Sequence, residues 1–418
     1  MVLIKSSWCT FKKVLETRQN ICKPACNSAV FKLKQRNFHC SVCNKEEANK
    51  KSEETPLKTL LEDAASFGDV QRNNVEQQWA TLPYLQGTKI RKQGEYFHKP
   101  KVDPRNTSVI LFPGQGSQFV GMAKDLLKFP MARDLFELAN YILKYDLLKL
   151  CLEGPKSKLD ETRYCQPAVM VTSLATLERL KEERPNAIEN CVATAGFSLG
   201  EITALVFAGA LGFERALQLV KIRAEAMHLA SEAYKGGMAT VFYTPESNLG
   251  KAVIKAKEWA LERGAENPEC CVANYLYPHC KVVSGSLEAL DYLEKNLMEY
   301  KLKKIKRLPV SGAFHSSLME PAVGPFLKAL KKTEVSDPVI SVFSNVDGKK
   351  YRDANHIRRQ LPKQIVKPVR WEQLLHVIYE RDQDEYFPKT FECGPGSSLK
   401  AILKQVNGKA WNHCITIN

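Results

Sequence analysis

One short stretch of the chain combines a hydroxyl group with glycines that could expose it. Residues 195–201 read Ala-Gly-Phe-Ser-Leu-Gly-Glu, a G-x-S-x-G pattern followed directly by an acid. Small and apolar residues at 191–195 precede it, and a helix-compatible run at 202–210 follows it. A strand, a tight turn bracketed by glycines and a helix form the context of a nucleophile elbow. Ser198 is therefore a candidate nucleophile at a helix N-terminus, where developing negative charge is favoured.

Two other interpretations of this stretch remain open at this point. A bare G-x-S-x-G also arises by chance in glycine-rich turns, so alone it is only a hypothesis. Residues 193–213 have about the length of a bilayer-spanning helix, with Glu201 as their only charge. Such a helix would place Glu201 and Ser198 in hydrocarbon. A buried strand, turn and helix explains the same residues better, and we expect no membrane span.

Two further loops contain residues suited to a site. An apolar run at 108–112 predicts a buried strand, and it ends in Pro-Gly-Gln-Gly-Ser-Gln at 113–118. This loop lacks the Lys-Ser/Thr of a phosphate-binding loop, so we predict an amide, that of Gln115, beside a site at the end of the strand. His315 lies in a glycine- and serine-rich loop at 311–319, after another predicted strand. Of the eight histidines it has the strongest local context.

Helical patterns surround these loops at 131–144, 166–181 and 213–232. In the second pattern, Pro167 would occupy the first turn, where proline is tolerated. In the third, Arg223 and Met227 are four residues apart and so share one face.

Residues 237–310 differ in pattern from the rest. Strands are predicted at 238–243, 270–275, 280–284 and 304–310, and helices at 249–263 and 287–300. The resulting β-α-β-β-α-β order is ferredoxin-like, and it predicts a small inserted subdomain. Later strand-to-loop transitions are predicted at 339–344, 366–371 and 390–396.

The N-terminus carries about half of the excess positive charge. The formal net charge is +15, and residues 1–45 contain nine Lys and Arg residues with Glu16 as their only acid. A basic, acid-poor segment without a long apolar core is typical of a mitochondrial transit peptide, which we expect to be removed between Phe38 and about Glu46. A disordered basic tail is the alternative. The remaining charge does not favour a nucleic-acid partner.

Cysteine usage favours a reduced enzyme without a metal. Five of the thirteen cysteines precede residue 45, where Cys40 and Cys43 form a C-x-x-C pair with no second pair at zinc-finger spacing. The others are scattered. We expect neither a disulfide nor a metal site.

Taken together, the 113–118 loop, the Ser198 elbow and the His315 loop resemble the malonyl-CoA:acyl carrier protein transacylase family, in its mitochondrial form. The resemblance covers roughly residues 107–408. Its motifs occur in family order at 113–118, 166–168, 196–201, Arg223 with Met227, 312–319, 345–347, 368–371 and 392–396.

The resemblance implies a two-step acyl transfer without a cofactor. Ser198 would take the acyl group from the CoA thioester, with His315 as general base, and pass it to the phosphopantetheine thiol of an acyl carrier protein. The backbone amides of Gln115 and Leu199 would form the oxyanion hole. Arg223 would bind the free carboxylate of malonate.

The resemblance places further side chains in the substrate site, namely Gln166, Met227 and Phe314. Phe314 matches an aromatic found in malonyl-selective relatives, which implies malonyl-CoA as substrate. No catalytic aspartate is assigned, because the candidate acids between serine and histidine, such as Glu225 and Asp291, lack a suitable context. The family orients its histidine by other hydrogen bonds, including one from the loop at 368–371, where Arg370 replaces the glutamine of some relatives.

We therefore predict an α/β fold, with an α/β-hydrolase-like core containing a parallel sheet and an inserted ferredoxin-like α+β subdomain. The expected division is a transit peptide at 1–45, an extension at 46–105, a core at 106–236 and 311–408, the subdomain at 237–310 and a tail at 409–418. We expect a monomer of the mitochondrial matrix. A basic cluster could steer an acidic carrier protein, and comprises Lys301, Lys303, Lys304, Lys306 and Arg307.

Two other functions stay open on the sequence. A serine thioesterase or hydrolase would use the same elbow, and more hydrolysis than transfer would reveal it. A basic mitochondrial RNA-associated factor would need basic patches interleaved with aromatic residues, which the sequence lacks.

Overall fold

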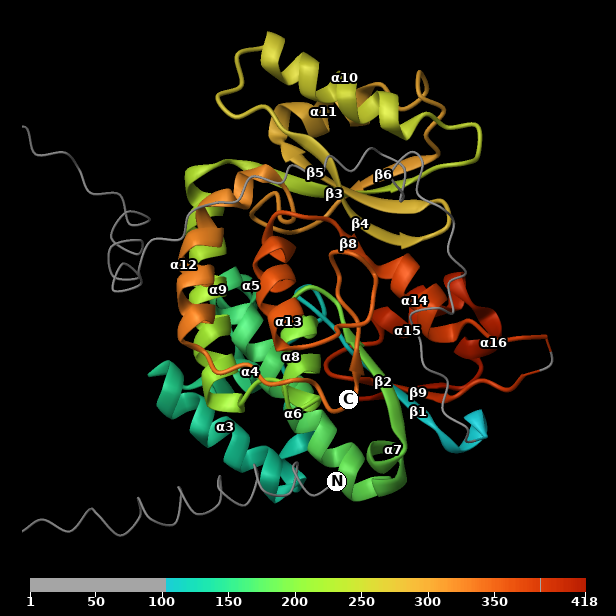
Figure 1. Cartoon of the computed structure of the whole chain (residues 1–418). Coiled ribbons are helices and arrows are strands. Elements are labelled where there is room, and N and C mark those ends of the chain that lie inside the picture. The colour runs from blue at the N-terminus through green and yellow to red at the C-terminus, as the bar shows by residue number, and fades with distance from the viewer. Residues whose placement is uncertain (1–102, 384) are drawn as a thin grey trace, which may run out of the picture. The chain divides into compact units, whose positions relative to one another are not determined.

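The computed structural model describes residues 103–383 and 385–418 (Figure 1). The expected transit peptide at 1–45, with its five cysteines, lies outside the described residues. So do residues 46–102 of the expected extension.

A five-stranded parallel sheet, sheet A, forms the centre of the core in the described part of the chain. Its strand order is β10-β9-β1-β2-β7. The strands are β1 Ser108–Phe112, β2 Cys191–Gly196, β7 Ser341–Val342, β9 Lys389–Cys393 and β10 Cys414–Ile417. All five residues of β1 are buried, as expected for a parallel strand that is covered on both faces. Phe112 pairs with Gly196, so β1 and β2 end at the same edge and their loops meet there.

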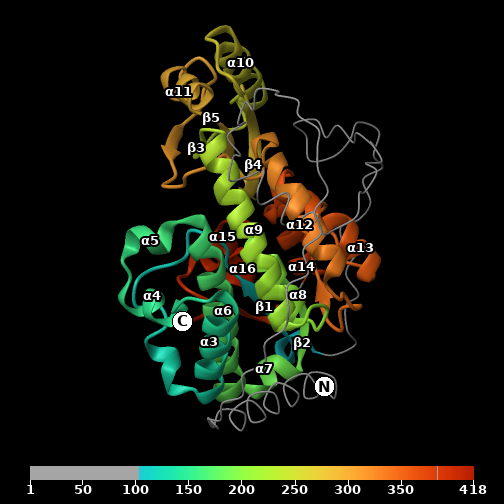
Figure 2. The ribbon, with the colours of Figure 1, turned by 90° about the vertical axis from the view of Figure 1, so that its left-hand side faces the viewer.

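The helices of the core come from both halves of the chain. Those before the inserted segment are α3 Pro130–Leu143, α4 Leu147–Glu153, α5 Lys156–Asp160, α6 Thr162–Glu183, α7 Pro185–Glu189, α8 Leu199–Phe207 and α9 Phe213–Ala233. Those after it are α12 Glu320–Lys332, α13 Ala354–Gln360, α14 Trp371–Tyr379, α15 Ser398–Val406 and α16 Gly408–Trp411, with short 3₁₀ helices η5 Ser317–Met319 and η6 Leu361–Ile365. The α9 helix packs between α6 and α12 (Figures 1 and 2). These contacts hold α9, which carries Arg223, firmly against the core.

A second sheet, sheet B, has the order β6-β3-β5-β4-β8. Its members are β3 Gly236–Phe242, β4 Cys270–Tyr277, β5 Cys280–Ser286, β6 Lys304–Arg307 and β8 Val369–Arg370. The first four are antiparallel in the ferredoxin-like order, and α10 Leu249–Glu262 and α11 Leu287–Lys295 cover one face (Figure 1). The short β8 comes from the core segment and pairs in parallel with β4. Sheet B is therefore tied to the core by a strand that lies within the transition predicted at 366–371, although the sequence pattern did not indicate its pairing with β4.

The hydrophobic interior consists of separate clusters. One joins β1 and β2 to Trp371 and the α14 and α15 helices, and another lies between β3, β5, α10 and α11.

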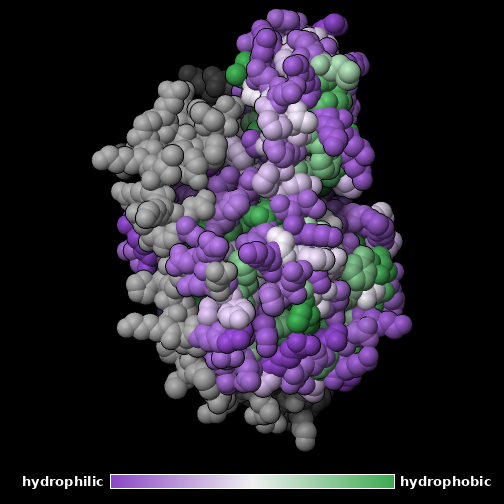
Figure 3. Space-filling view, turned by 90° about the vertical axis from the view of Figure 1, so that its right-hand side faces the viewer, coloured by the Kyte–Doolittle hydropathy of each residue, from purple (hydrophilic) through white to green (hydrophobic). Residues whose placement is uncertain are grey.

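The face that bears α14 to α16 is mostly hydrophilic (Figure 3). None of the helices in the described part is both long and apolar enough to cross a membrane. All eight cysteines beyond residue 102 are free thiols.

The structure corrects two expectations. The α6 helix begins at Thr162, so Pro167 lies inside it instead of in its first turn; the helix is buried on most of its surface, and this packing outweighs the lost hydrogen bond. Residues 409–418 are not a tail, because β10 pairs with β9 at the edge of sheet A. Only the pairing with β9 identifies β10, since its four residues carry little pattern of their own.

Candidate active site

The turn between β2 and α8 holds Ser198 in a strained conformation. Its φ of 51° and ψ of −103° are unusual for a residue other than glycine. A Cβ atom at Gly196 would overlap the carbonyl of Gly200, and one at Gly200 would overlap that of Phe112. Both glycines are therefore required by close backbone approach. The predicted elbow is confirmed as a strand, a sharp turn and a helix.

Asn345 fixes this turn from the loop after β7. Its Oδ1 accepts a hydrogen bond from the amide of Ser198 at 2.7 Å, and its Nδ2 donates to the carbonyl of Gly196 at 2.8 Å. One side chain thus satisfies backbone groups on both sides of Phe197. Such support can maintain a strained turn in one conformation.

His315 lies directly beside the serine. Its Nε2 is 2.9 Å from Ser198 Oγ, and its Nδ1 is 2.7 Å from the main-chain oxygen of Gln364. Because a carbonyl oxygen only accepts, Nδ1 carries the proton and Nε2 is free to accept from the serine hydroxyl. This is the tautomer of a general base.

The environment of His315 keeps the ring neutral. Burial, and next the charge of Arg223, lower the pKa of His315 to about 4, although the carbonyls of Gln364 and Lys367 favour the protonated form. The residue is 4% exposed and has a φ of 60°. At neutral pH the imidazole is therefore an uncharged acceptor next to Ser198.

Sheet B holds the loop that carries His315. Ser284 on β5 donates to the carbonyl of Phe314 at 2.6 Å, and Ser317 donates to the carboxylate of Glu269, just before β4. Glu269 also accepts from the amide of Cys270 and from Lys257. The histidine loop is thus fixed from outside sheet A.

Arg223 points from α9 at the same serine. Its NH2 donates to Ser198 Oγ at 3.0 Å and to Gln364 Oε1 at 2.8 Å, and its NH1 donates to Gln166 Oε1 at 2.6 Å. The residue is 1% exposed. Burial lowers its pKa to about 10, which leaves the guanidinium charged at neutral pH.

This buried cation has no carboxylate in contact. No Asp or Glu of the described chain lies within ion-pair distance of Arg223, and its Nε has no hydrogen-bond partner. A buried charge normally requires a partner of opposite sign. The arrangement therefore favours an anionic group on the ligand, close to the serine.

The other expected site residues occupy different positions. Gln166 Nε2 donates to Met227 Sδ at 3.6 Å, so both surround Arg223, and Phe314 is buried next to His315. Leu199 is the first residue of α8, so its amide has no acceptor within that helix. The side chain of Gln115 donates to Thr162 Oγ1 at 3.1 Å. The amide of Phe197 donates to the carbonyl of Phe112, which holds the loop after β1 next to the turn after β2.

The structure corrects the expected hydrogen bond to His315 and shows the contacts of Arg370 and Asp291. The acceptor of Nδ1 is the carbonyl of Gln364 and not a group in the loop at 368–371. Arg370 donates instead to the carbonyl of Val346 at 3.0 Å and lies over the ring of Tyr275. Asp291 is engaged with Arg307 on sheet B.

Two residues of the site were not identified from the sequence. Gln364 lies in η6, within a segment that has no recognisable motif, and only the fold brings it to Ser198. Glu201 was noted as the acid behind the serine but was given no role. In the structure, its carboxylate is fully buried and contacts both Gln364 and Tyr351.

The basic cluster on β6 and in the preceding turn is partly neutralised. Arg307 pairs with Asp291 and Glu294, and Lys301 lies 3.8 Å from Glu246. Within residues 103–383 and 385–418, no group of three or more His, Cys, Asp and Glu side chains is arranged to hold a metal ion.

Comparison with known proteins places this geometry in context. The family model for the acyl transferase domain matches residues 109–403. The chain is 62% identical over 312 residues to the probable mitochondrial malonyl-CoA-acyl carrier protein transacylase of Drosophila melanogaster, covering 75% of this chain and 82% of that protein. It is 52% identical over 308 residues to the mitochondrial malonyl-CoA-acyl carrier protein transacylase of Homo sapiens, covering 74% and 79%. The solved acyl-carrier-protein-S-malonyltransferase of Bartonella henselae superposes with a TM-score of 0.66 at 30% identity, covering 74% of this chain and 95% of that one.

Proposed function

The chain belongs to the acyl transferase domain family, and on this premise we propose that it transfers malonyl groups from malonyl-CoA to the phosphopantetheine thiol of an acyl carrier protein. The observation that carries the proposal is the position of the buried Arg223, 3.0 Å from Ser198 Oγ and without a contacting carboxylate. Malonyl-CoA offers both a thioester for the serine and a carboxylate for the arginine.

In the first half-reaction Ser198 attacks the thioester carbonyl. His315 Nε2 takes the hydroxyl proton as the C–O bond forms, and the charge that develops on the carbonyl oxygen is stabilised by the amides of Leu199 and Gln115. The tetrahedral intermediate collapses as the C–S bond breaks. His315 then returns the proton to the sulfur of CoA, which leaves a malonyl ester on Ser198.

In the second half-reaction the carrier thiol replaces CoA. His315 takes the proton of the phosphopantetheine thiol, the sulfur attacks the malonyl ester, and Ser198 leaves with the proton returned from His315. No redox step and no external cofactor are needed. The same base therefore serves both halves of the cycle.

Arg223 would select malonyl over neutral acyl groups. A fixed guanidinium can bind a carboxylate through two parallel hydrogen bonds, whereas an acetyl group would leave the charge buried without a partner. Gln166 and Gln364 each accept a hydrogen bond from the guanidinium and so fix its position. Met227 and Phe314 would line the acyl site.

The remaining features of the proposal concern the whole chain. The names of the relatives support a mitochondrial location and an acyl carrier protein as partner. We place the protein in the matrix as a monomer, with residues 1–45 as its transit peptide. The subdomain at 237–310 is inserted into the acyltransferase core. The basic cluster would attract the acidic carrier protein.

A thiol-release assay separates transfer from hydrolysis. CoA release from malonyl-CoA is followed with and without holo-acyl carrier protein. A transferase releases about one CoA per enzyme without the acceptor and turns over when it is added. Continuous release without acceptor, at the same rate as with it, would contradict the proposal and indicate a thioesterase.

A further inference from the structure

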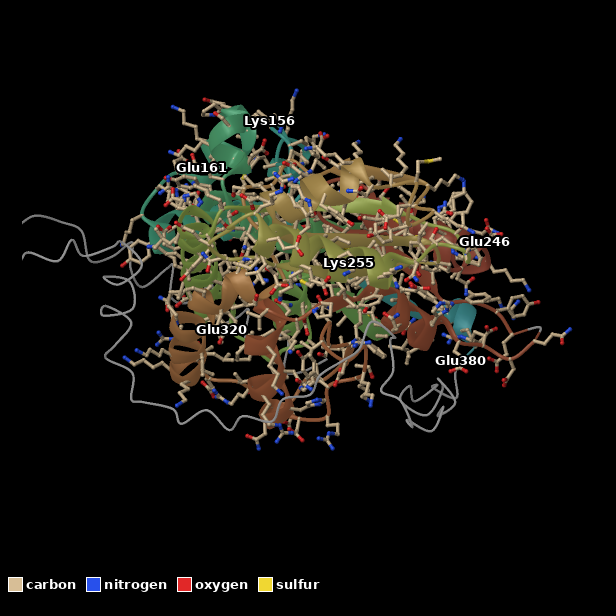
Figure 4. The ribbon with its side chains drawn as sticks, turned by 90° about the horizontal axis from the view of Figure 1, so that it is seen from above. Lys156, Glu161, Glu246, Lys255, Glu320 and Glu380 are labelled. Carbon is tan, nitrogen blue, oxygen red and sulfur yellow. The ribbon has the colours of Figure 1, made fainter. Side chains whose placement is uncertain are left out.

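The acid behind the nucleophile is buried in a way that the transfer mechanism does not explain. Glu201 is 0% exposed, whereas acids such as Glu246 and Glu320 lie at the outside of the molecule (Figure 4). Removing a carboxylate from water is costly unless hydrogen bonds replace the lost hydration. Burial raises the pKa of Glu201 to about 7 against the opposing effect of its hydrogen bonds. Glu201 therefore does not serve as a surface charge.

A helix cap is the simplest explanation for Glu201, and the geometry excludes it. Ser198 and Glu201 have the spacing of a capping box, in which the acid bonds back to the N-cap amide. Here the amide of Ser198 is bonded to Asn345 instead, and the serine side chain makes no cap bond. The carboxylate of Glu201 turns away from its own helix. It accepts from Tyr351 Oη at 2.6 Å, from the amide of Asn345 at 3.2 Å, and from Gln364 Nε2.

Gln364 connects this carboxylate to the reacting groups. Its Nε2 donates to Glu201 Oε2 and to the main-chain oxygen of Ser198 at 2.8 Å, which uses both amide hydrogens. Its Oε1 therefore faces the other way and accepts from Arg223 NH2 at 2.8 Å. A turned amide would set its oxygen against two acceptors and its NH₂ against the guanidinium, so only one orientation is satisfied.

The donors around Glu201 thus determine what Arg223 meets. The Tyr351 hydroxyl, the Asn345 amide and Gln364 Nε2 all donate to Glu201, so its carboxyl group accepts in this network, and Gln364 presents NH₂ to it and oxygen to the arginine. Burial lowers the pKa of Arg223, and the charge of Glu201 opposes this effect through space. We propose that Glu201, acting through the side chain of Gln364, is a positioning residue that holds Arg223 in the orientation that binds the carboxylate of the acyl group.

The inference rests on the proposed malonyl transfer and concerns its selectivity. Glu201→Gln keeps the volume of the side chain but cannot satisfy the network. If the new amide oxygen still accepts from Tyr351 and Asn345, the new NH₂ group opposes the NH₂ group of Gln364 and displaces that side chain from Arg223. If Gln364 turns instead, its own NH₂ group faces Arg223, which then loses Gln364 Oε1 as an acceptor. In both cases the contact between Gln364 and Arg223 is disturbed, while Ser198 and His315 keep their mutual contact.

The test is the rate of acyl-serine formation from malonyl-CoA and from acetyl-CoA, followed by intact mass under single-turnover conditions. For Glu201→Gln we expect the malonyl rate to fall about 10- to 100-fold, as for loss of a hydrogen bond to a charged group, with the acetyl rate within about threefold. Tyr351→Phe is the control, since it removes one donor to Glu201 but leaves the bridge to Gln364 intact. Its malonyl-to-acetyl ratio should equal that of the unmodified chain.

Equal losses for both substrates, or no loss, in folded Glu201→Gln would overturn the inference, because a merely structural acid has no reason to distinguish the two acyl groups. If Glu201→Gln does not fold, Gln364→Met is used, which removes the bridge but keeps the main-chain acceptor of His315. A selective malonyl loss supports the inference and an unselective one overturns it. If the unmodified chain forms no malonyl-serine, both the proposed function and the inference are wrong. If the unmodified chain forms malonyl-serine but the variant loses both activities equally, only the inference is wrong.

Discussion

At the scale of single residues, burial has opposite consequences for the two basic groups beside Ser198. It lowers the pKa of both His315 and Arg223. The pKa of His315 starts near neutrality, so the ring loses its proton and becomes a usable base. The pKa of Arg223 starts far higher, so the guanidinium remains charged and available to an anion. One low-dielectric site therefore contains a neutral base and a persistent cation.

The low pKa of His315 predicts how Ser198 reactivity depends on pH. A general base must be unprotonated, and a pKa of about 4 keeps it so throughout the mildly acidic range. We expect inactivation by phenylmethylsulfonyl fluoride, a neutral serine reagent that does not need Arg223, to change less than about twofold between pH 8 and pH 6. An ordinary histidine, with a pKa of about 6.5, would lose well over half of its reactivity over that range. A midpoint near pH 6.5 would show that His315 is not held neutral.

Arg223→Lys should change substrate choice more than chemistry. Lysine keeps the charge but cannot offer two parallel donors or bridge Gln166 to Gln364. We expect kcat/KM for malonyl-CoA to fall roughly 10²-fold or more, while that for acetyl-CoA stays within about threefold. Arg215→Lys, an exposed position on the same helix, is the matched control. Equal effects on both substrates would argue against carboxylate recognition by Arg223.

At the scale of elements, the site depends on how closely β1 approaches α8. The two are in contact through Gly200, where the carbonyls of Phe112 and Pro113 leave no room for a side chain. This contact also sets the distance between the two candidate oxyanion donors, the amides of Gln115 and Leu199.

Gly200→Ala should therefore disturb both stability and activity. Forcing a methyl group into such a contact typically costs about 1–3 kcal/mol, which corresponds to a fall of several degrees in Tm. We also expect acyl-serine formation to slow by at least tenfold, as when an oxyanion donor is displaced. Gly408→Ala, where a Cβ atom would meet nothing within 4 Å, should leave both Tm and rate unchanged. Wild-type behaviour of Gly200→Ala would contradict the close contact.

Elements with a local sequence pattern could be predicted, whereas contacts between distant segments could not. The β2–α8 elbow and the strands and helices of the inserted segment carry local patterns, and the structure confirms these elements. β10 is a four-residue strand that only its pairing with β9 identifies, and the transition predicted at 366–371 gave no indication that β8 pairs with β4. Pro167 is tolerated inside α6 because of tertiary packing. Gln364 and the bridge to Glu201 depend on a loop that is 163 residues from the acid. Such contacts leave no local signal.

At the scale of the whole molecule, the proposed catalytic pair, Ser198 and His315, is held by two different sheets. Ser198 is held by sheet A, whereas the loop that carries His315 is held by Ser284 and Glu269 of the sheet B segment. The proposed general base is therefore positioned by residues outside the parallel core.

Ser284→Ala should weaken the chemistry without weakening substrate binding. It leaves the buried carbonyl of Phe314 without its donor, which costs about 1–3 kcal/mol and loosens the neighbouring histidine. We expect kcat to fall about tenfold with KM for malonyl-CoA nearly unchanged. Ser286→Ala is the control, since this buried serine on the same strand makes no side-chain hydrogen bond. A rise in KM with constant kcat in Ser284→Ala would contradict this role of sheet B.

The central claim is a malonyl ester on Ser198, and intact mass analysis tests it most directly. The chain is mixed briefly with malonyl-CoA, separated from it, and measured beside Ser198→Ala. We expect a gain of one malonyl group in the unmodified chain, none in the variant, and loss of the gain when holo-acyl carrier protein is added. A correctly folded chain that gains no mass, or an adduct that persists in Ser198→Ala, would contradict the account.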